Sequence, residues 1–353
     1  MGIGDVARKV APVAGVLVGA TALGAAASYG AIRAAGEQDK DVGTGMQLLG
    51  MMAGNPLVTG GFAGIAAWQV VGRVKGGNLV PGPFEILLMP AAIGGAALGA
   101  RLAREHLETK YQSEYDTQLQ NIDRTMEATR AALREAGAGD DVLARVPERY
   151  DRSYFNASYQ PPLGPFRNDI VVGRHPDSGL PFAADDVIAH EFTHKVLHAY
   201  SPELLGIGGG GDGRAIHESV ADTIAMVVDR EDWLVGEDAV EGGIRSFSHP
   251  EERGSFRDGE AVPAPITREQ LADAEEEHLG AGVGNKAAWR IGDALGRDAM
   301  ARIYVAALER RDLPRGASYA DLARVVRAAS VDLYGAGSHE AQIVDASWTE
   351  AGY

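Results

Sequence analysis

Two histidines and a glutamate stand at the spacing of a metal site in this 353-residue chain, within the segment DVIAHEFTH that begins at residue 186. His190 and His194 are four residues apart, so on a helix they share one face and both imidazoles can reach one metal ion. Glu191, beside the first histidine, can deprotonate a water molecule on that ion. The alternative is an exposed helix face that carries two ordinary histidines.

A second helical segment, AIHESVAD, places Glu218 and Asp222 four residues apart. A catalytic zinc ion commonly has three protein ligands and one open position, and His-His-Glu is one such set. We therefore predict that His190, His194 and Glu218 bind zinc. Asp222 would accept a ring N–H from a ligand histidine and fix its orientation, unless the two acids simply lie on a helix surface. His217 is expected to point away from the ligands.

Composition excludes several other kinds of site. The chain has no cysteine, which rules out disulfides, a cysteine nucleophile and thiolate metal ligands. It carries 33 basic and 49 acidic residues, a net charge of −16. A nucleic-acid partner bound through a broad basic surface is therefore not expected.

The first 104 residues differ from the rest of the chain. They hold eight basic and five acidic side chains, a net charge of +3, which leaves −19 for the remainder. Three stretches have almost no charge: Val10–Ile32, Val42–Gly72 and Gly76–Ala100. Each is long enough to cross a hydrocarbon layer of about 30 Å as a helix, although all three are rich in alanine and glycine.

We therefore expect residues 1–104 to form two or three transmembrane helices, with a lipid membrane as partner. The protein would then be located in a membrane, with its catalytic domain outside the cytoplasm. Two alternatives stay open for this region, namely a buried helical hairpin of a soluble protein and a signal peptide over the first stretch. The signal peptide corresponds to a secreted protein.

Residues 105–353 have the pattern of a folded domain that is α+β in class and mainly α. Residues 103–136 predict one long helix that ends before Gly137. Residues 150–184 predict much loop and one short strand, at 169–172. After residue 185 the pattern is helical, and the helix Ser318–Tyr334 should stop at Gly335. A short strand region followed by a C-terminal helical lobe is expected.

Over roughly residues 105–353, the chain resembles the thermolysin-like zinc metallopeptidases. The resemblance rests on the zinc-ligand segments, on His278 followed at the family's spacing by Gly282 and NKAA (residues 285–288), and on the tail SVDLYG (residues 330–335). It implies a zincin-type domain that hydrolyses bonds in peptide or protein substrates.

The resemblance also implies roles for particular residues. Glu191 corresponds to the general base, and Asp222 to the carboxylate that orients a ligand histidine. Arg245 would bind a substrate carbonyl, and His278, oriented by Asp273, would stabilise the oxyanion. The residues that would bind substrate are Asn156 and Ala157 on an edge strand, Arg245, and Val187 and Ile244 in a pocket. That pocket predicts cleavage before a bulky apolar residue.

The family's calcium site has counterparts here as well. The matching acids are Asp186, Asp229, Asp232 and Glu237. One further acid of the family pattern is replaced by Leu234. Oxygen ligands suit a hard cation such as calcium, and the resemblance implies one calcium ion rather than a pair. The alternative is simple surface acidity.

Two departures from the family pattern are relevant to function. The tyrosine that assists the oxyanion histidine is absent, and Leu204 and Leu205 stand at its place. Tyr200 would replace it only if its loop folds back. Most of the family's β-rich N-terminal half is also missing from the match. The competing hypotheses are an inactive metalloprotease fold that serves as a membrane-associated binding module, and a translocated effector protease.

Overall fold

The computed structural model describes residues 3–37, 88–162, 168–176, 178–205, 212–257, 259–271 and 277–353. Contacts along the chain define two compact units. The first comprises residues 1–116 together with 151–156 and 176–179, and the second comprises residues 117–150, 157–175 and 180–353. The domain boundary at residue 104 stays a prediction.

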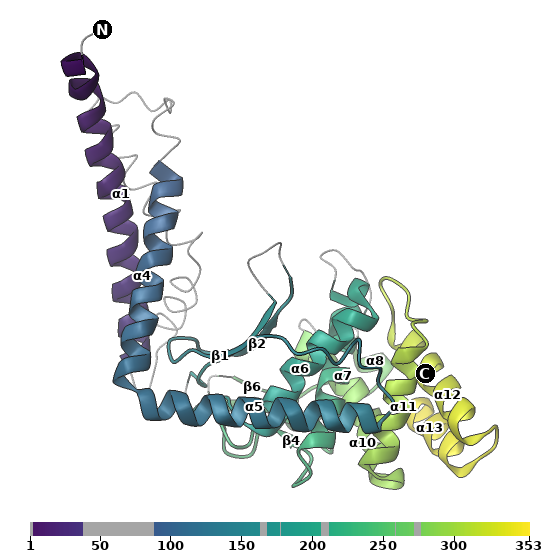
Figure 1. Ribbon diagram of the computed structural model, residues 1–353. Coiled ribbons are helices and arrows are strands. Elements are labelled where there is room, and N and C mark those ends of the chain that lie inside the picture. The colour runs from purple at the N-terminus through teal and green to yellow at the C-terminus, as the bar shows by residue number, and fades with distance from the viewer. Residues whose placement is uncertain are drawn as a thin grey trace. The chain divides into compact units, whose positions relative to one another are not determined.

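The first unit contains two long helices that pack along each other, α1 (Ile3–Glu37) and α4 (Leu88–Lys110) (Figure 1). Small side chains such as Ala35 and Ala96 are fully buried there. A Cβ atom on Gly95 would overlap the carbonyl oxygen of Thr21 on α1. Glycine is therefore needed at this point because the two helix backbones approach so closely.

The predicted transmembrane helices find no support in this unit. Within the ranges that the structure describes, no helix is both long enough and apolar enough to cross a bilayer. Helix α1 contains the first predicted span and α4 contains part of the third, while Val42–Gly72 lies outside the described residues. The stretches lack charge, but alanine and glycine carry little apolar surface per residue, which weakens their transfer into lipid.

The second unit begins within α5 (Gln112–Glu135). The sequence predicts one helix over residues 103–136, whereas the structure interrupts it at Tyr111, between α4 and α5. No glycine or proline marks this interruption.

A three-stranded sheet follows, with strand order β1-β3-β2. Strand β1 (Glu148–Tyr150) runs parallel to β3 (Asp169–Val172), and β2 (Ala157–Gln160) runs antiparallel to β3. The short strand predicted at 169–172 is thus confirmed. Strand β2 lies at an edge of this sheet. This edge strand contributes to the candidate site.

Two small hairpins and nine helical segments complete the described part of the unit. The hairpins pair β4 (Leu234–Val235) with β5 (Arg245–Ser246), and β6 (Ser255–Arg257) with β7 (Glu260–Val262). The helical segments are α6 (Asp185–Tyr200), η2 (Pro202–Leu205), α7 (Gly213–Val228), α8 (Arg268–Leu271), α9 (Glu277–Gly280), α10 (Gly282–Leu295), α11 (Arg297–Glu309), α12 (Tyr319–Tyr334) and α13 (His339–Glu350). Few strands and many helices confirm the expected mainly helical fold.

Helix α7 lies at the centre of the helical core. It packs on α6, α10 and α11, and α12 and α13 pack on each other beyond them (Figure 1). Phe192 on α6, Ile224 on α7 and Ile291 on α10 are buried in these contacts. A Cβ atom on Gly284 would overlap the Ser219 side chain, so glycine lets α10 approach α7 closely. This packing fixes α6 against α7, the two helices that carry the predicted ligands.

Helix α12 has the start and stop that its sequence predicts. The Ser318 side chain accepts from the backbone N–H of Asp321, whose carboxylate accepts from the Ser318 N–H in return, and the helix ends before Gly335 at φ 93°. This reciprocal cap satisfies two backbone donors at the helix start.

A matched pair of glycine substitutions tests the packing of the first unit. We expect Gly95→Ala to destabilise the α1–α4 pair by about 1–3 kcal/mol, because the new methyl group forces the helices apart. Gly94→Ala places a methyl group in open space one residue away and should stabilise α4 by about 0.5–1 kcal/mol. Hydrogen exchange of the α4 amides measures both effects, and equal protection in the two variants would contradict this packing.

Candidate functional site

Helices α6 and α7 bring the three predicted zinc ligands together. His190 Nε2 lies 3.2 Å from Glu218 Oε2, and His194 Nε2 lies 3.6 Å from Glu218 Oε1. The centroids of the His190 and His194 rings are 4.4 Å apart, and the rings meet edge to face. All three side chains are at least 85% buried. The spacing of four residues on α6 therefore places both histidine side chains next to the Glu218 carboxylate, as the sequence predicts.

The chemistry of these atoms fits a metal ion. His190 Nδ1 lies 2.7 Å from Asp222 Oδ1, so a proton held between them leaves the Nε2 lone pair facing Glu218. His194 Nδ1 is buried and has no hydrogen-bond partner among the residues that the structure describes. Two imidazole lone pairs and a carboxylate that face one another repel unless a proton or a metal ion lies between them. Zinc binds this set of ligands in proteins.

Electrostatics at the same point favour positive charge. Burial disfavours a charged His190, but Asp222 and Glu218 outweigh it and raise the pKa of His190 to about 10. Burial also disfavours ionised Glu218, but His194 and His190 outweigh it and hold the pKa of Glu218 well below its usual value. Burial lowers the pKa of His194 well below its usual value, which keeps that ring neutral and able to ligate.

Asp222 orients His190 and is itself held on two sides. Arg245 donates from Nε and Nη2 to its two carboxylate oxygens, at 2.9 and 2.6 Å. Asn285 Nδ2 donates to Asp222 Oδ2 at 2.9 Å. Burial opposes the charge of Asp222, but Arg245 and His190 outweigh it and lower its pKa. The carboxylate is therefore ionised and fixed in place beside the ligand ring.

Asn285 is a site residue that sequence reasoning did not assign. It lies in α10, 63 positions after Asp222 in the chain, and its side chain is buried. It belongs to the NKAA segment that supports the family resemblance. That resemblance marked the segment but gave its first residue no role.

Glu191 is held by the edge strand. The backbone N–H of Tyr159 on β2 donates to Glu191 Oε2 at 2.6 Å. Glu191 is buried, and burial raises its pKa above the usual glutamate value. A base with a raised pKa takes up a proton more readily near neutral pH. Sequence spacing gives no sign of this contact, because Tyr159 precedes Glu191 by 32 residues.

The same contact shows which backbone groups of β2 face outward. The Tyr159 N–H points away from β3, its antiparallel partner. Alternate residues of such a strand share their hydrogen-bonding direction, so the N–H and C=O of Ala157 also point away from β3. Asn156 is exposed, directly precedes β2 and groups with the first unit.

The predicted oxyanion residues are only partly described. His278 Nε2 on α9 lies 3.3 Å from Glu218 Oε2, and its side chain is 39% exposed. Asp273 lies outside the described residues. The hydroxyl of buried Tyr200 donates to Glu309 Oε1 at 2.5 Å. Tyr200 is therefore engaged elsewhere and does not supply the missing tyrosine hydroxyl.

The remaining predicted substrate residues, Val187 and Ile244, both lie in the second unit. Val187 is buried in the first turn of α6, and Ile244 directly precedes β5 and is half-buried. Their role as a pocket for an apolar side chain stays a prediction.

His217 departs from its expected direction. Instead of pointing away from the ligands, its ring stacks on the ring of His194, with centroids 4.5 Å apart and planes 14° apart. His217 is buried, and within the described part of the chain neither ring nitrogen has a hydrogen-bond partner. The start of α7 is buried on several sides, so the residue before Glu218 also faces the protein interior.

Three of the four predicted calcium residues form a cluster. Asp186, Asp229 and Glu237 place one carboxylate oxygen each within 4.8 Å of the others. Asp186 also accepts from the backbone N–H groups of Gly236 and Val187. Asp232 is not in this cluster, and its Oδ1 accepts from the Leu234 N–H at 2.7 Å.

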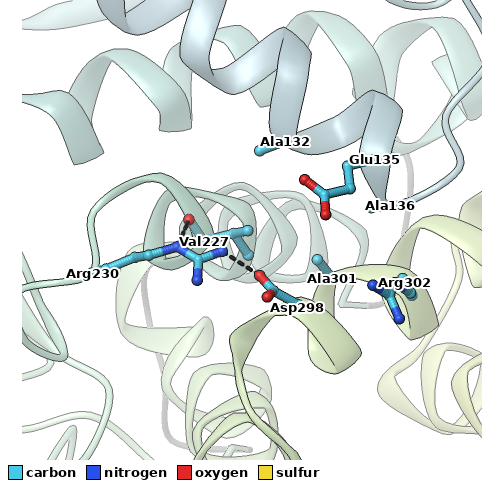
Figure 2. Close-up of a pocket in the computed structure, with 8 residues that line it drawn as sticks. All are labelled: Ala132, Glu135, Ala136, Val227, Arg230, Asp298, Ala301 and Arg302. Atoms are coloured by element: carbon cyan, nitrogen blue, oxygen red, sulfur yellow. Dashed lines mark hydrogen bonds and ion pairs between the residues drawn. The ribbon is translucent and has the colours of Figure 1, made fainter.

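A surface pocket lies apart from these residues (Figure 2). It is formed mainly by α5, α11 and the end of α7, and the Arg230–Asp298 ion pair crosses it. Its lining residues are Ala132, Glu135, Ala136, Val227, Arg230, Asp298, Ala301 and Arg302. None of them belongs to the predicted site, and the ion pair already balances two of its charges.

Several known proteins are similar to part of this chain. Residues 210–353 match the model of the thermolysin metallopeptidase alpha-helical domain. A bacillolysin from Brevibacillus brevis is 30% identical over 231 residues, 61% of this chain and 41% of the relative. A zinc metalloproteinase from Listeria monocytogenes is 31% identical over 164 residues, 44% of this chain and 30% of the relative. An extracellular elastase from Staphylococcus epidermidis is 31% identical over 176 residues, with 48% and 32% covered.

These matches confirm the resemblance to the thermolysin-like metallopeptidases. Zinc, with calcium beside it, agrees with that family and with the two clusters of potential ligands. The chain spans less than half the length of these three relatives.

The predicted membrane location is wrong. No helix in the described part of the chain can cross a bilayer, and one of the relatives is named as an extracellular enzyme. The lipid membrane expected as a partner of residues 1–104 therefore has no support.

The acidic cluster predicts a pH-dependent effect of calcium on stability. Burial and the neighbouring acids raise the pKa of Asp186 to about 7 and that of Glu237 to about 9. A carboxyl group whose pKa is raised by folding stabilises the fold below its unfolded pKa and loses that contribution as pH rises through its folded pKa. Calcium binds the ionised form, so it should offset a loss that grows between about pH 4 and pH 9.

Thermal unfolding of the zinc-loaded chain, with and without calcium, measures this effect. We expect the increase in melting temperature caused by calcium to grow from pH 5.5 to pH 8.5. Asp229→Asn should shrink that increase, whereas Asp232→Asn should change it less. An increase that is constant or falls with pH would contradict calcium binding at this cluster.

Proposed function

We propose that this chain is a zinc-dependent endopeptidase of the thermolysin type. The observation that carries the proposal is the convergence of His190, His194 and Glu218 on one point, with Glu191 buried beside them. The family match and the relatives support the same activity. Peptides or proteins are the proposed substrates.

The three ligands would hold zinc, which supplies Lewis acidity that activates water and polarises a carbonyl group. Glu191 accepts the proton of the attacking water and delivers it to the leaving amine, a role worth about 10²–10⁴ in rate. The Tyr159 N–H fixes one oxygen of Glu191 and so leaves the other oxygen for the proton. Asp222 keeps His190 in the tautomer that presents Nε2 to the ion.

The edge of β2 that faces away from β3 would bind the substrate as an additional strand. Ala157 directs its backbone N–H and C=O to that edge, next to the carboxylate of Glu191. Main-chain hydrogen bonds of this kind bind extended peptides with little regard to sequence. Asn156 would contribute from the position before the strand. An extended peptide on this edge would then have a backbone carbonyl close to the metal.

His278 and Arg245 would bind the reacting part of the substrate. His278 Nε2, near Glu218 and partly exposed, would donate to the oxyanion, with Asp273 as its orienting partner. Asp222 already uses Nε and Nη2 of Arg245. A contact between Arg245 and a substrate carbonyl would therefore come from Nη1.

The calcium site is proposed at Asp186, Asp229 and Glu237, with Asp232 as an outer neighbour. A bound divalent cation would neutralise this partly buried acidic cluster beside the first turn of helix α6, which carries His190 and His194. The secreted alternative fits the relatives better than a membrane location does.

A glutamine substitution tests the general base. We expect Glu191→Gln to lower kcat/KM for peptide hydrolysis by about 10²–10⁴ while zinc binds as in the wild type, because Glu191 is not a ligand. Glu252→Gln changes an exposed glutamate and serves as the matched control. The measurements are zinc content and peptide cleavage by the full chain, with and without a chelator. A wild type that binds zinc but cleaves nothing would support the inactive binding module.

The pocket assigned to Val187 and Ile244 predicts substrate preference. Cleavage of a peptide library should occur before bulky apolar residues, because both side chains are apolar and would exclude charge. Val187→Asp should reduce cleavage before leucine more than cleavage before lysine. A library in which charged residues follow the cut would overturn this assignment.

A further inference from the structure

The two ligand histidines are supported in different ways. Nδ1 of His190 lies 2.7 Å from Asp222 Oδ1, in a carboxylate that Arg245 and Asn285 hold. Nδ1 of His194 is buried, and the described residues give it neither such a carboxylate contact nor a hydrogen-bond partner. Ligand histidines usually donate their second ring N–H to an acceptor that fixes the ring. The orientation of His194 must therefore come from packing.

The ring of His217 supplies that packing. It lies against the face of His194 with centroids 4.5 Å apart and planes only 14° from parallel. His217 is 2% exposed, so the protein interior restricts its own movement. Its position directly before Glu218 ties it to the backbone that carries the third ligand.

The stacked geometry argues against His217 as a fourth ligand. A nitrogen of His217 does lie within 4.8 Å of possible ligand atoms of His194 and Glu218. An imidazole nitrogen, however, binds a metal ion in the plane of its ring, at about 2.0–2.1 Å. Two nearly parallel, stacked rings have no common in-plane point at that distance. His217 cannot coordinate the ion of His194 while it stacks on that ring.

We propose that His217 positions the zinc ligand His194 through the face of its ring, in place of the close carboxylate contact that His190 makes with Asp222. The inference rests on the proposed zinc site. It assigns no task to the nitrogens of His217, for which the described ranges offer no hydrogen-bond partner. A flat aromatic side chain should therefore replace His217, whereas an aliphatic one should not.

The zinc affinities of two variants test whether a flat aromatic ring, rather than a nitrogen of His217, is required. We expect His217→Leu to weaken zinc binding by about tenfold to a hundredfold, the usual effect of losing support for a ligand. His217→Phe keeps a flat ring and should bind within about threefold of the wild type. His249→Leu makes the same change at a histidine whose side chain is 60% exposed, and it should bind zinc as the wild type does. Chelator competition on the full chain gives the affinities.

The visible absorption of the cobalt-substituted protein adds a readout of ligand number. Its bands should keep their intensity in His217→Leu, because no ligand is lost. Equal weakening in the leucine and phenylalanine variants, or altered cobalt bands, would show that a nitrogen of His217 is required and would overturn the proposal. Unchanged zinc affinity in His217→Leu would also overturn it.

Thermal unfolding of the metal-free variants verifies that they fold. Loss of the imidazole breaks no hydrogen bond of its ring nitrogens, so His217→Leu should fold. If the larger phenylalanine prevents folding, weaker zinc binding by His217→Leu with unchanged cobalt bands still supports the proposal. A wild type that binds no zinc would instead overturn the proposed function itself.

Discussion

Mutual repulsion among ligand atoms is the constraint on which the site depends. Nε2 of His190, Nε2 of His194 and the Glu218 carboxylate converge from two helices in a buried region. Such a group is stable only if positive charge lies among its members, because burial weakens the screening that water would provide. The packing of α7 against α6, α10 and α11 holds the group together.

Different neighbouring residues contact His190 and Glu191. Asp222 lies 2.7 Å from Nδ1 of His190 and is itself held by Arg245 and Asn285. The backbone of β2 fixes Glu191. Each of these contacts joins elements that are far apart in the sequence, so the chemistry depends on the fold of the whole second unit rather than on α6 alone.

Local periodicity made the proximity of these side chains predictable. A spacing of four residues places His190 with His194, and Glu218 with Asp222, on single helix faces whatever the rest of the fold is. The contacts between Tyr159 and Glu191 and between Asn285 and Asp222 were not predictable in this way, since 32 and 63 positions separate their partners. The direction of His217 likewise depends on burial of the start of α7. Tyr200 bonds Glu309, which lies 109 positions away.

The first unit shows that uncharged stretches alone do not identify transmembrane helices. Absence of charge over Val10–Ile32 is compatible with a membrane span and with a tightly packed helix pair, and composition decides between them only weakly. Helices α1 and α4 approach closely at glycine and alanine residues. The same small residues favour contacts between helices in lipid. The break at Tyr111, with no glycine or proline to mark it, was not predictable from propensity.

Diffraction at the zinc absorption edge, from crystals of the full chain grown with zinc, would locate the metal ion. We expect one strong anomalous peak at about 2.0–2.2 Å from Nε2 of His190, from Nε2 of His194 and from a Glu218 carboxylate oxygen, with a fourth position open to solvent. A peak that is not bonded to Glu218, or an ion enclosed by four protein ligands, would contradict this expectation.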